Sequence, residues 1–145
     1  SSQVMRAAIE GRGDAPLKLL AVTVLTSFDQ RDLADMGYEC PLSDLVALRV
    51  RKAMGAGMDG LVCSPLDVAA VRAQAGPDAI LVTPGVRSGG AAKGDQKRVA
   101  TPAEAIRDGA NYVVMGRQIT RAADPAAEAA RVAEEIAESQ AAACQ

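Results

Sequence analysis

The chain has 145 residues, a formal net charge of −2 at pH 7, and no histidine or tryptophan. The length suits a single domain over 1–145 but falls well short of the roughly 250 residues of a complete (β/α)₈ barrel. The lack of histidine removes the commonest general base and metal ligand, and the near-neutral charge gives no basic field for nucleic acid.

Cysteine usage and hydropathy indicate the compartment. The three cysteines, Cys40, Cys63 and Cys144, are widely spaced and form no Cys-x-x-Cys pair, which favours reduced thiols over a zinc site or a disulfide framework. No apolar run has the length of a membrane span, and no signal-peptide pattern opens the chain. We therefore expect a soluble cytoplasmic protein that binds neither a membrane nor nucleic acid.

Hydrophobic periodicity predicts helices and strands in alternation. Two of the helices have clear start signals, Ser64-Pro65 and the capping box from Thr101 to Glu104. The last helix begins at Asp124-Pro125, and the tail Gln140–Gln145 is expected to fray. We expect helices at 3–11, 31–36, 42–54, 65–75, 102–109 and 125–139, and strands within 17–26 and at 60–64, 79–83 and 112–115.

The pattern of the strands indicates a parallel sheet. The run Leu19–Leu25 is almost continuously apolar, so both of its faces are expected to be buried. Strands separated by helices are typical of right-handed parallel crossovers, as in a doubly wound sheet or part of a barrel. A dinucleotide-binding sheet would carry Gly-x-Gly-x-x-Gly after its first strand, where Thr26–Asp29 stands instead. The glycines cluster after the third strand, which favours the barrel.

Two consecutive strand ends carry groups suited to a phosphate monoester. Arg87 follows the third strand, and Gly116-Arg117 follows the fourth. Barrels commonly bind phosphate on the loops after their last two strands, and arginine can grip two phosphate oxygens at once. Glycine permits close approach of the backbone. Either arginine alone would more often be a solvated surface charge, but two at consecutive strand ends favour an anion site. The glycine-rich segment 88–97 is expected to be a mobile loop that closes over the phosphate.

Several other residues have simpler interpretations. Cys63 is expected to be an inert buried thiol. Glu134, Glu135 and Glu138 are expected to form the solvated face of the last helix. The opposite stripe of that helix is expected to be core packing; it comprises Ala126, Ala129, Ala130, Ala133, Ile136 and Ala137.

Six blocks together resemble orotidine 5′-phosphate decarboxylase. They lie in that family's order and at close to its spacing, and they match the second half of its barrel: Ala21–Ser27, Asp59–Ser64, Leu81–Arg87, Gly94–Arg98, Thr101–Ala105 and Gly116–Thr120. The resemblance implies a (β/α)₈ barrel that works as a homodimer. It implies conversion of orotidine 5′-phosphate to uridine 5′-phosphate and carbon dioxide, without metal or organic cofactor, in pyrimidine biosynthesis.

The resemblance also implies residue roles. Thr26 would contact the pyrimidine, Arg87 and Gln96 would lie on the phosphate-closing loop, and Gly116 and Arg117 would bind phosphate oxygens. The family's catalytic Asp-x-Lys-x-x-Asp motif is absent; the nearest string, Asp95–Ala100, has alanine where the second aspartate is needed. We therefore expect no catalytic residue and no metal ligand in this chain, and an inactive segment by itself. The alternatives are a non-catalytic nucleotide-binding half-barrel and a 3-keto-sugar-phosphate decarboxylase of the same superfamily.

Overall fold

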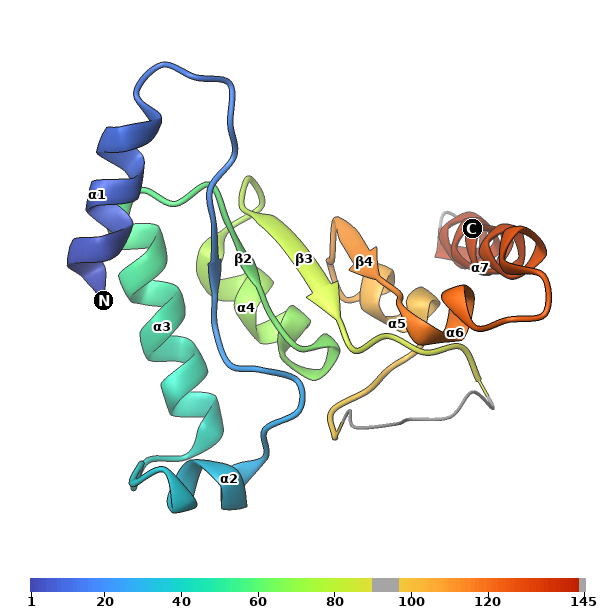
Figure 1. Cartoon of the computed structure of the whole chain (residues 1–145), viewed down its shortest axis with the longest axis horizontal. Coiled ribbons are helices and arrows are strands. Elements are labelled where there is room, and N and C mark those ends of the chain that lie inside the picture. The colour runs from blue at the N-terminus through green and yellow to red at the C-terminus, as the bar shows by residue number, and fades with distance from the viewer. Residues whose placement is uncertain (90–96, 144–145) are drawn as a thin grey trace.

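A computed structural model describes residues 1–89 and 97–143. Four parallel strands form one sheet in the order in which they occur in the chain (Figure 1). They are β1 (Leu20–Val22), β2 (Gly60–Val62), β3 (Ile80–Pro84) and β4 (Tyr112–Val114). A doubly wound sheet reverses its strand order, whereas a barrel adds each strand beside the preceding one. The observed order is therefore the barrel order that the sequence predicts.

Helices connect the strands at close to the predicted positions. They are α1 (Ser2–Arg12), α2 (Gln30–Asp35), α3 (Leu42–Ala56), α4 (Val68–Ala75), α5 (Pro102–Arg107), α6 (Arg117–Thr120) and α7 (Pro125–Ala143), with a 3₁₀ turn at Pro65–Asp67. The short helix α6 was not predicted. The expected fraying of the tail is wrong as far as Ala143, because α7 continues to that residue. None of the helices within these described ranges is both long enough and apolar enough to cross a membrane.

The start of α5 shows how the sequence determines a helix boundary. The Thr101 hydroxyl accepts a hydrogen bond from the Glu104 backbone N–H at 3.2 Å, and the Glu104 carboxylate accepts from the Thr101 N–H at 2.8 Å. These two bonds satisfy donors that have no partner inside the helix. The predicted capping box is confirmed, and it fixes where the chain returns from the loop after β3.

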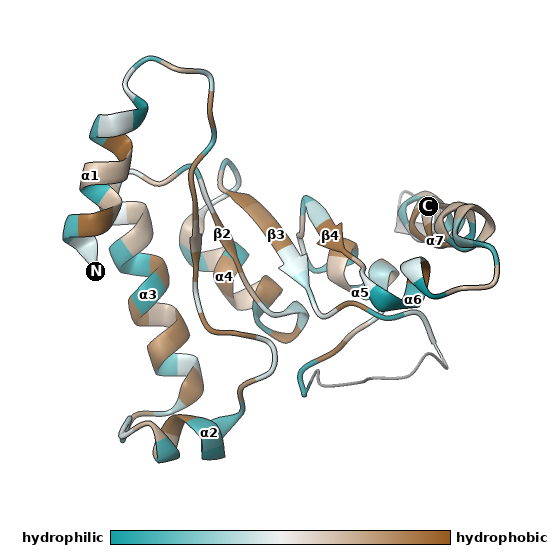
Figure 2. Ribbon diagram, viewed as in Figure 1, coloured by the Kyte–Doolittle hydropathy of each residue, from teal (hydrophilic) through white to brown (hydrophobic). Residues whose placement is uncertain are grey.

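One face of the sheet is buried and the other is open. Leu61 and Leu81 are fully buried and belong to one core cluster with apolar residues of α3 and α4. Figure 2 shows hydrophobic segments on the strands and on these two helices. Val22 and Tyr112 lie on the opposite face and are 57% and 63% exposed. The expectation that the first strand is buried on both faces is therefore wrong. In a closed barrel facing strands fill the interior, whereas the four strands here leave that face uncovered.

The last helix does not pack through its alanine stripe. Its alanine stripe is exposed at Ala126, Ala129, Ala130, Ala133 and Ala137, while Val132 is buried and Ile136 half-buried. The expectation that the stripe is core packing is wrong, because α7 packs on α5 and α6 through Val132 and a polar side. Glu134 and Glu138 are exposed as expected, but Glu135 is only half-exposed and accepts a hydrogen bond from Ser88.

Candidate active site at the carboxyl ends of the strands

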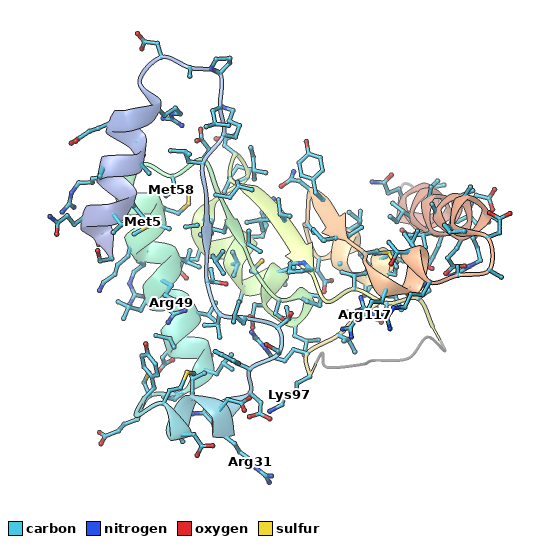
Figure 3. All side chains as sticks on the ribbon, viewed as in Figure 1. Met5, Arg31, Arg49, Met58, Lys97 and Arg117 are labelled. Atoms are coloured by element: carbon cyan, nitrogen blue, oxygen red, sulfur yellow. The ribbon has the colours of Figure 1, made fainter. Side chains whose placement is uncertain are left out.

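The candidate site residues lie at one edge of the sheet. Because the strands are parallel, their carboxyl ends meet at the same edge, and Thr26, Arg87 and Gly116-Arg117 follow the ends of β1, β3 and β4. Figure 3 shows Arg117 at this edge and Lys97 on the segment that returns from the loop after β3. Gln96, the remaining predicted site residue, lies outside the described residues.

Thr26 is a buried junction between the first strand and the segment that follows β3. The residue is buried, and its carbonyl accepts hydrogen bonds from the backbone N–H groups of Lys97 and Arg98, both at 3.3 Å. The chain that returns from the loop is thus joined to the end of β1. The described residues on the two sides of the loop are thus anchored beside β3 and beside β1.

Arg87 begins that same loop from a fixed position. Val86 and Ala100 form a parallel bridge, and the Arg87 backbone N–H donates to the Ala100 carbonyl at 3.0 Å. The Arg87 guanidinium is half-buried and donates through Nη1 to the Val86 carbonyl at 2.7 Å. The two segments that flank the loop are therefore hydrogen-bonded to each other at its base.

Gly116 and Arg117 leave β4 with open space beside the backbone. A Cβ atom placed on Gly116 would meet nothing within 4 Å, so this part of the main chain is accessible. The Gly116 carbonyl accepts from the N–H groups of Ile119 and Thr120 at 2.9 and 3.0 Å, which starts α6. Arg117 is the first residue of that helix and is exposed. Both residues are thus exposed just after the end of β4, where the sequence predicts a contact with phosphate.

A buried ion pair that the sequence did not indicate supports this edge. The Arg98 guanidinium lies 2.5 Å from the Asp67 carboxylate, and the two side chains are 9% and 14% exposed. Arg98 also donates to the carbonyls of Val24 and Leu25 at 3.4 and 3.2 Å. The pair joins the ends of β1 and β2 to the returning loop. Residues 67 and 98 belong to separate motifs, so no local spacing could have revealed their contact.

Lys97 is held by carboxylates at the start of α2. Its ammonium lies 3.0 Å from Asp29 and 2.7 Å from Asp32, and these hydrogen bonds raise the pKa of Lys97, with Asp32 having the larger effect. The backbone N–H of Asp32, and then Lys97, lower the pKa of Asp29 to about 2. Lys97 is therefore a charged tether for the end of the loop. The described part of the string Asp95–Ala100 thus takes part in structural contacts at the end of the loop.

Cys63 is buried, as the sequence predicts. Burial raises the pKa of the Cys63 thiol to about 11, which keeps it protonated at neutral pH. Within residues 1–89 and 97–143, no three cysteine or acidic side chains are grouped as a metal site.

The fold and the placement of these residues define the class: a (β/α)₈-barrel protein with its candidate site at the carboxyl ends of the strands. The model of the orotidine 5′-phosphate decarboxylase / HUMPS family matches residues 1–132, and the chain belongs to that family. The resemblance seen in the sequence motifs is thereby confirmed.

Relatives and solved structures agree on the family and on the coverage. The chain is 55% identical to an orotidine 5′-phosphate decarboxylase of Rhodopseudomonas palustris (strain BisB5) over 94% of its length, and 57% identical to one of Methylobacterium sp. (strain 4-46). It spans 58% and 59% of those proteins. The crystal structure of orotidine 5′-phosphate decarboxylase from Lactobacillus acidophilus superposes with a TM-score of 0.75 at 34% identity, covering 94% of this chain and 59% of the other.

Proposed function

We propose that the protein containing this chain is an orotidine 5′-phosphate decarboxylase that releases carbon dioxide and forms uridine 5′-phosphate in pyrimidine biosynthesis. In this proposal the present chain supplies the phosphate- and pyrimidine-binding half of the site. The observation that supports it most is that Arg87 and the accessible Gly116-Arg117 pair follow the ends of two adjacent strands, in a chain of this family.

The proposed roles follow from the chemistry of each group. Arg117 offers a planar fork of donors to two phosphate oxygens, the Gly116 backbone N–H offers a third, and Arg87 adds charge from the neighbouring strand end. Thr26 would contact the pyrimidine from the end of β1. The phosphate group is remote from the reacting carbon, and its binding supplies free energy that holds the pyrimidine ring in place. This binding energy accelerates the reaction only if it is expressed in the transition state.

The proton donor and carboxylates for the decarboxylation itself lie, in this proposal, in the part of the protein that contains Asp-x-Lys-x-x-Asp. We assign no catalytic role to the residues of the described ranges, because the chain lacks the Asp-x-Lys-x-x-Asp motif. We also propose that the whole protein acts in the cytoplasm as a homodimer on a small-molecule substrate, without a metal or an organic cofactor. Its mass in solution, from light scattering, tests the dimer.

The decisive assay follows the absorbance of orotidine 5′-phosphate with the full-length protein. Turnover of orotidine 5′-phosphate, and none of a 3-keto-sugar phosphate, supports the proposal. Turnover of the 3-keto-sugar phosphate instead would assign the protein to the other activity of the superfamily. Tight binding of uridine 5′-phosphate with no turnover of either substrate would identify a nucleotide-binding module.

A further inference from the structure

A polar network joins the loop after β3 to the loop after β4. The Ser88 backbone N–H donates to Oε1 of Gln118 at 3.0 Å, and Nε2 of Gln118 donates to Glu128 at 2.7 Å. Ser88 is 4% exposed, so its N–H lies away from solvent and needs this partner. One side-chain amide therefore links three segments: the exit of β3, the start of α6, and α7.

On α7 the network consists of charged side chains that pair with one another. Arg131 donates to both oxygens of Glu128, at 3.0 and 2.7 Å, and lies 3.8 Å from Glu135. The Ser88 hydroxyl donates to Glu135 at 2.9 Å. The hydrogen bonds from Arg131, and then from Gln118, lower the pKa of Glu128 to about 2, so it is ionised and accepts at neutral pH. The polar face of α7 is thus a fixed support for both loops.

The position of the network in the chain gives it a functional meaning. Ser88 directly follows Arg87, and Gln118 directly follows Arg117. A hydrogen bond between Ser88 and Gln118 therefore ties together the backbone next to each arginine of the proposed phosphate site. The link needs a side chain that accepts from an N–H group and donates to a carboxylate at the same time, which an amide does and a carboxylate or an ammonium does not.

We propose that Gln118 is a positioning residue that fixes the backbones of Arg87 and Arg117 relative to each other, with α7 as its support, so that both arginines meet one phosphate group. This inference rests on the proposed phosphate site. It assigns to α7 a role beyond packing, because the helix faces the site with Glu128 and Glu135 rather than with its alanine stripe.

The test compares the affinities of uridine 5′-phosphate and uridine in the full-length protein, by calorimetry. The variants are Q118E, the exchange Q118E/E128Q, Arg117→Ala, and the matched control Gln74→Ala, whose amide bonds only the Ala47 carbonyl among the interactions described. Q118E places two carboxylates together and removes the donor to Glu128. We expect Q118E to weaken the affinity for uridine 5′-phosphate roughly tenfold, with little change in the affinity for uridine. The exchange restores a donor and an acceptor, and should recover most of the loss.

Hydrogen exchange at the Ser88 amide shows whether each variant changes the network itself, separately from its effect on ligand binding. The exchange rate of the Ser88 amide hydrogen should rise in Q118E, fall back in Q118E/E128Q, and stay unchanged in Gln74→Ala. If Arg117→Ala selectively weakens the affinity for uridine 5′-phosphate and Q118E does not, the positioning role of Gln118 is wrong and the proposed phosphate site is supported. If Arg117→Ala weakens both ligands equally, the phosphate site itself is wrong. If Q118E weakens the affinity for both ligands equally, or if the double variant Q118E/E128Q recovers no affinity, the network is only a structural contact.

Discussion

Removal of Arg98 is the sharpest stability test of the strand edge. The guanidinium is almost fully buried and pairs with a buried carboxylate, so Arg98→Met leaves the Asp67 charge in a poorly solvated place. Loss of one partner of a buried pair costs about 3–5 kcal/mol of unfolding free energy. The same change also frees the Leu25 carbonyl, which Arg98 binds at 3.2 Å.

The opposite substitution should cost less. Asp67→Asn removes the negative charge but leaves Arg98 with the carbonyls of Val24 and Leu25 as acceptors. We expect a loss of about 1–3 kcal/mol, the scale of one weakened charge-assisted hydrogen bond in the interior. The double variant R98M/D67N should be more stable than the sum of the two losses implies, because neither charge is then left alone.

Urea unfolding of the full-length protein, followed by circular dichroism, measures these differences. Arg107→Met is the control, because Arg107 lies 3.7 Å from Asp108 in an exposed pair that should contribute almost nothing. Raising the salt concentration should leave the Arg98 effect nearly unchanged, since buried pairs are weakly screened. Losses below about 0.5 kcal/mol for both single variants, equal to the control, would refute the argument that this pair is buried and structural.

Three further predictions concern the site and its surroundings. Arg117→Ala should cost about 1.5–3 kcal/mol of binding for uridine 5′-phosphate and little for uridine, and equal losses would show that it does not contact the phosphate. Cys63 should resist alkylation at pH 8 in the folded protein, because burial raises its pKa to about 11, and should react once urea unfolds the chain; rapid labelling of the native protein would contradict its burial. Hydrogen exchange across 88–97 should slow when uridine 5′-phosphate binds, and equal rates with and without the ligand would remove the loop-closure hypothesis.

Local signals in the sequence predicted the order of elements well. The capping box at Thr101 and Glu104 and the breaks near Gly76 and Gly109 are determined by neighbouring residues, and they appear where they were expected. The barrel order also followed, because helices between apolar strands leave few topologies. The placement of Thr26, Arg87 and Arg117 at one edge is a consequence of that order.

What the sequence could not predict depends on contacts between distant segments. Asp67 and Arg98 meet across different connections, and each alone looks like a surface charge. The periodicity of α7 is consistent with either face being buried, and the contacts of Glu128 and Glu135 with Gln118 and Ser88 determine the outcome. The exposed inner face of the sheet, with Val22, likewise depends on how many strands surround the barrel interior.

The most direct test of the account compares decarboxylation by the full-length protein with that by the 145-residue chain alone, each assayed by the loss of orotidine 5′-phosphate absorbance. The account predicts turnover by the full-length protein, loss of most of that turnover in its Arg117→Ala variant, and none by the isolated chain, because we propose that the catalytic lysine and aspartates lie elsewhere in the protein. A steady loss of substrate with the isolated chain, abolished by Arg117→Ala, would contradict it and place the catalytic residues within these 145 positions.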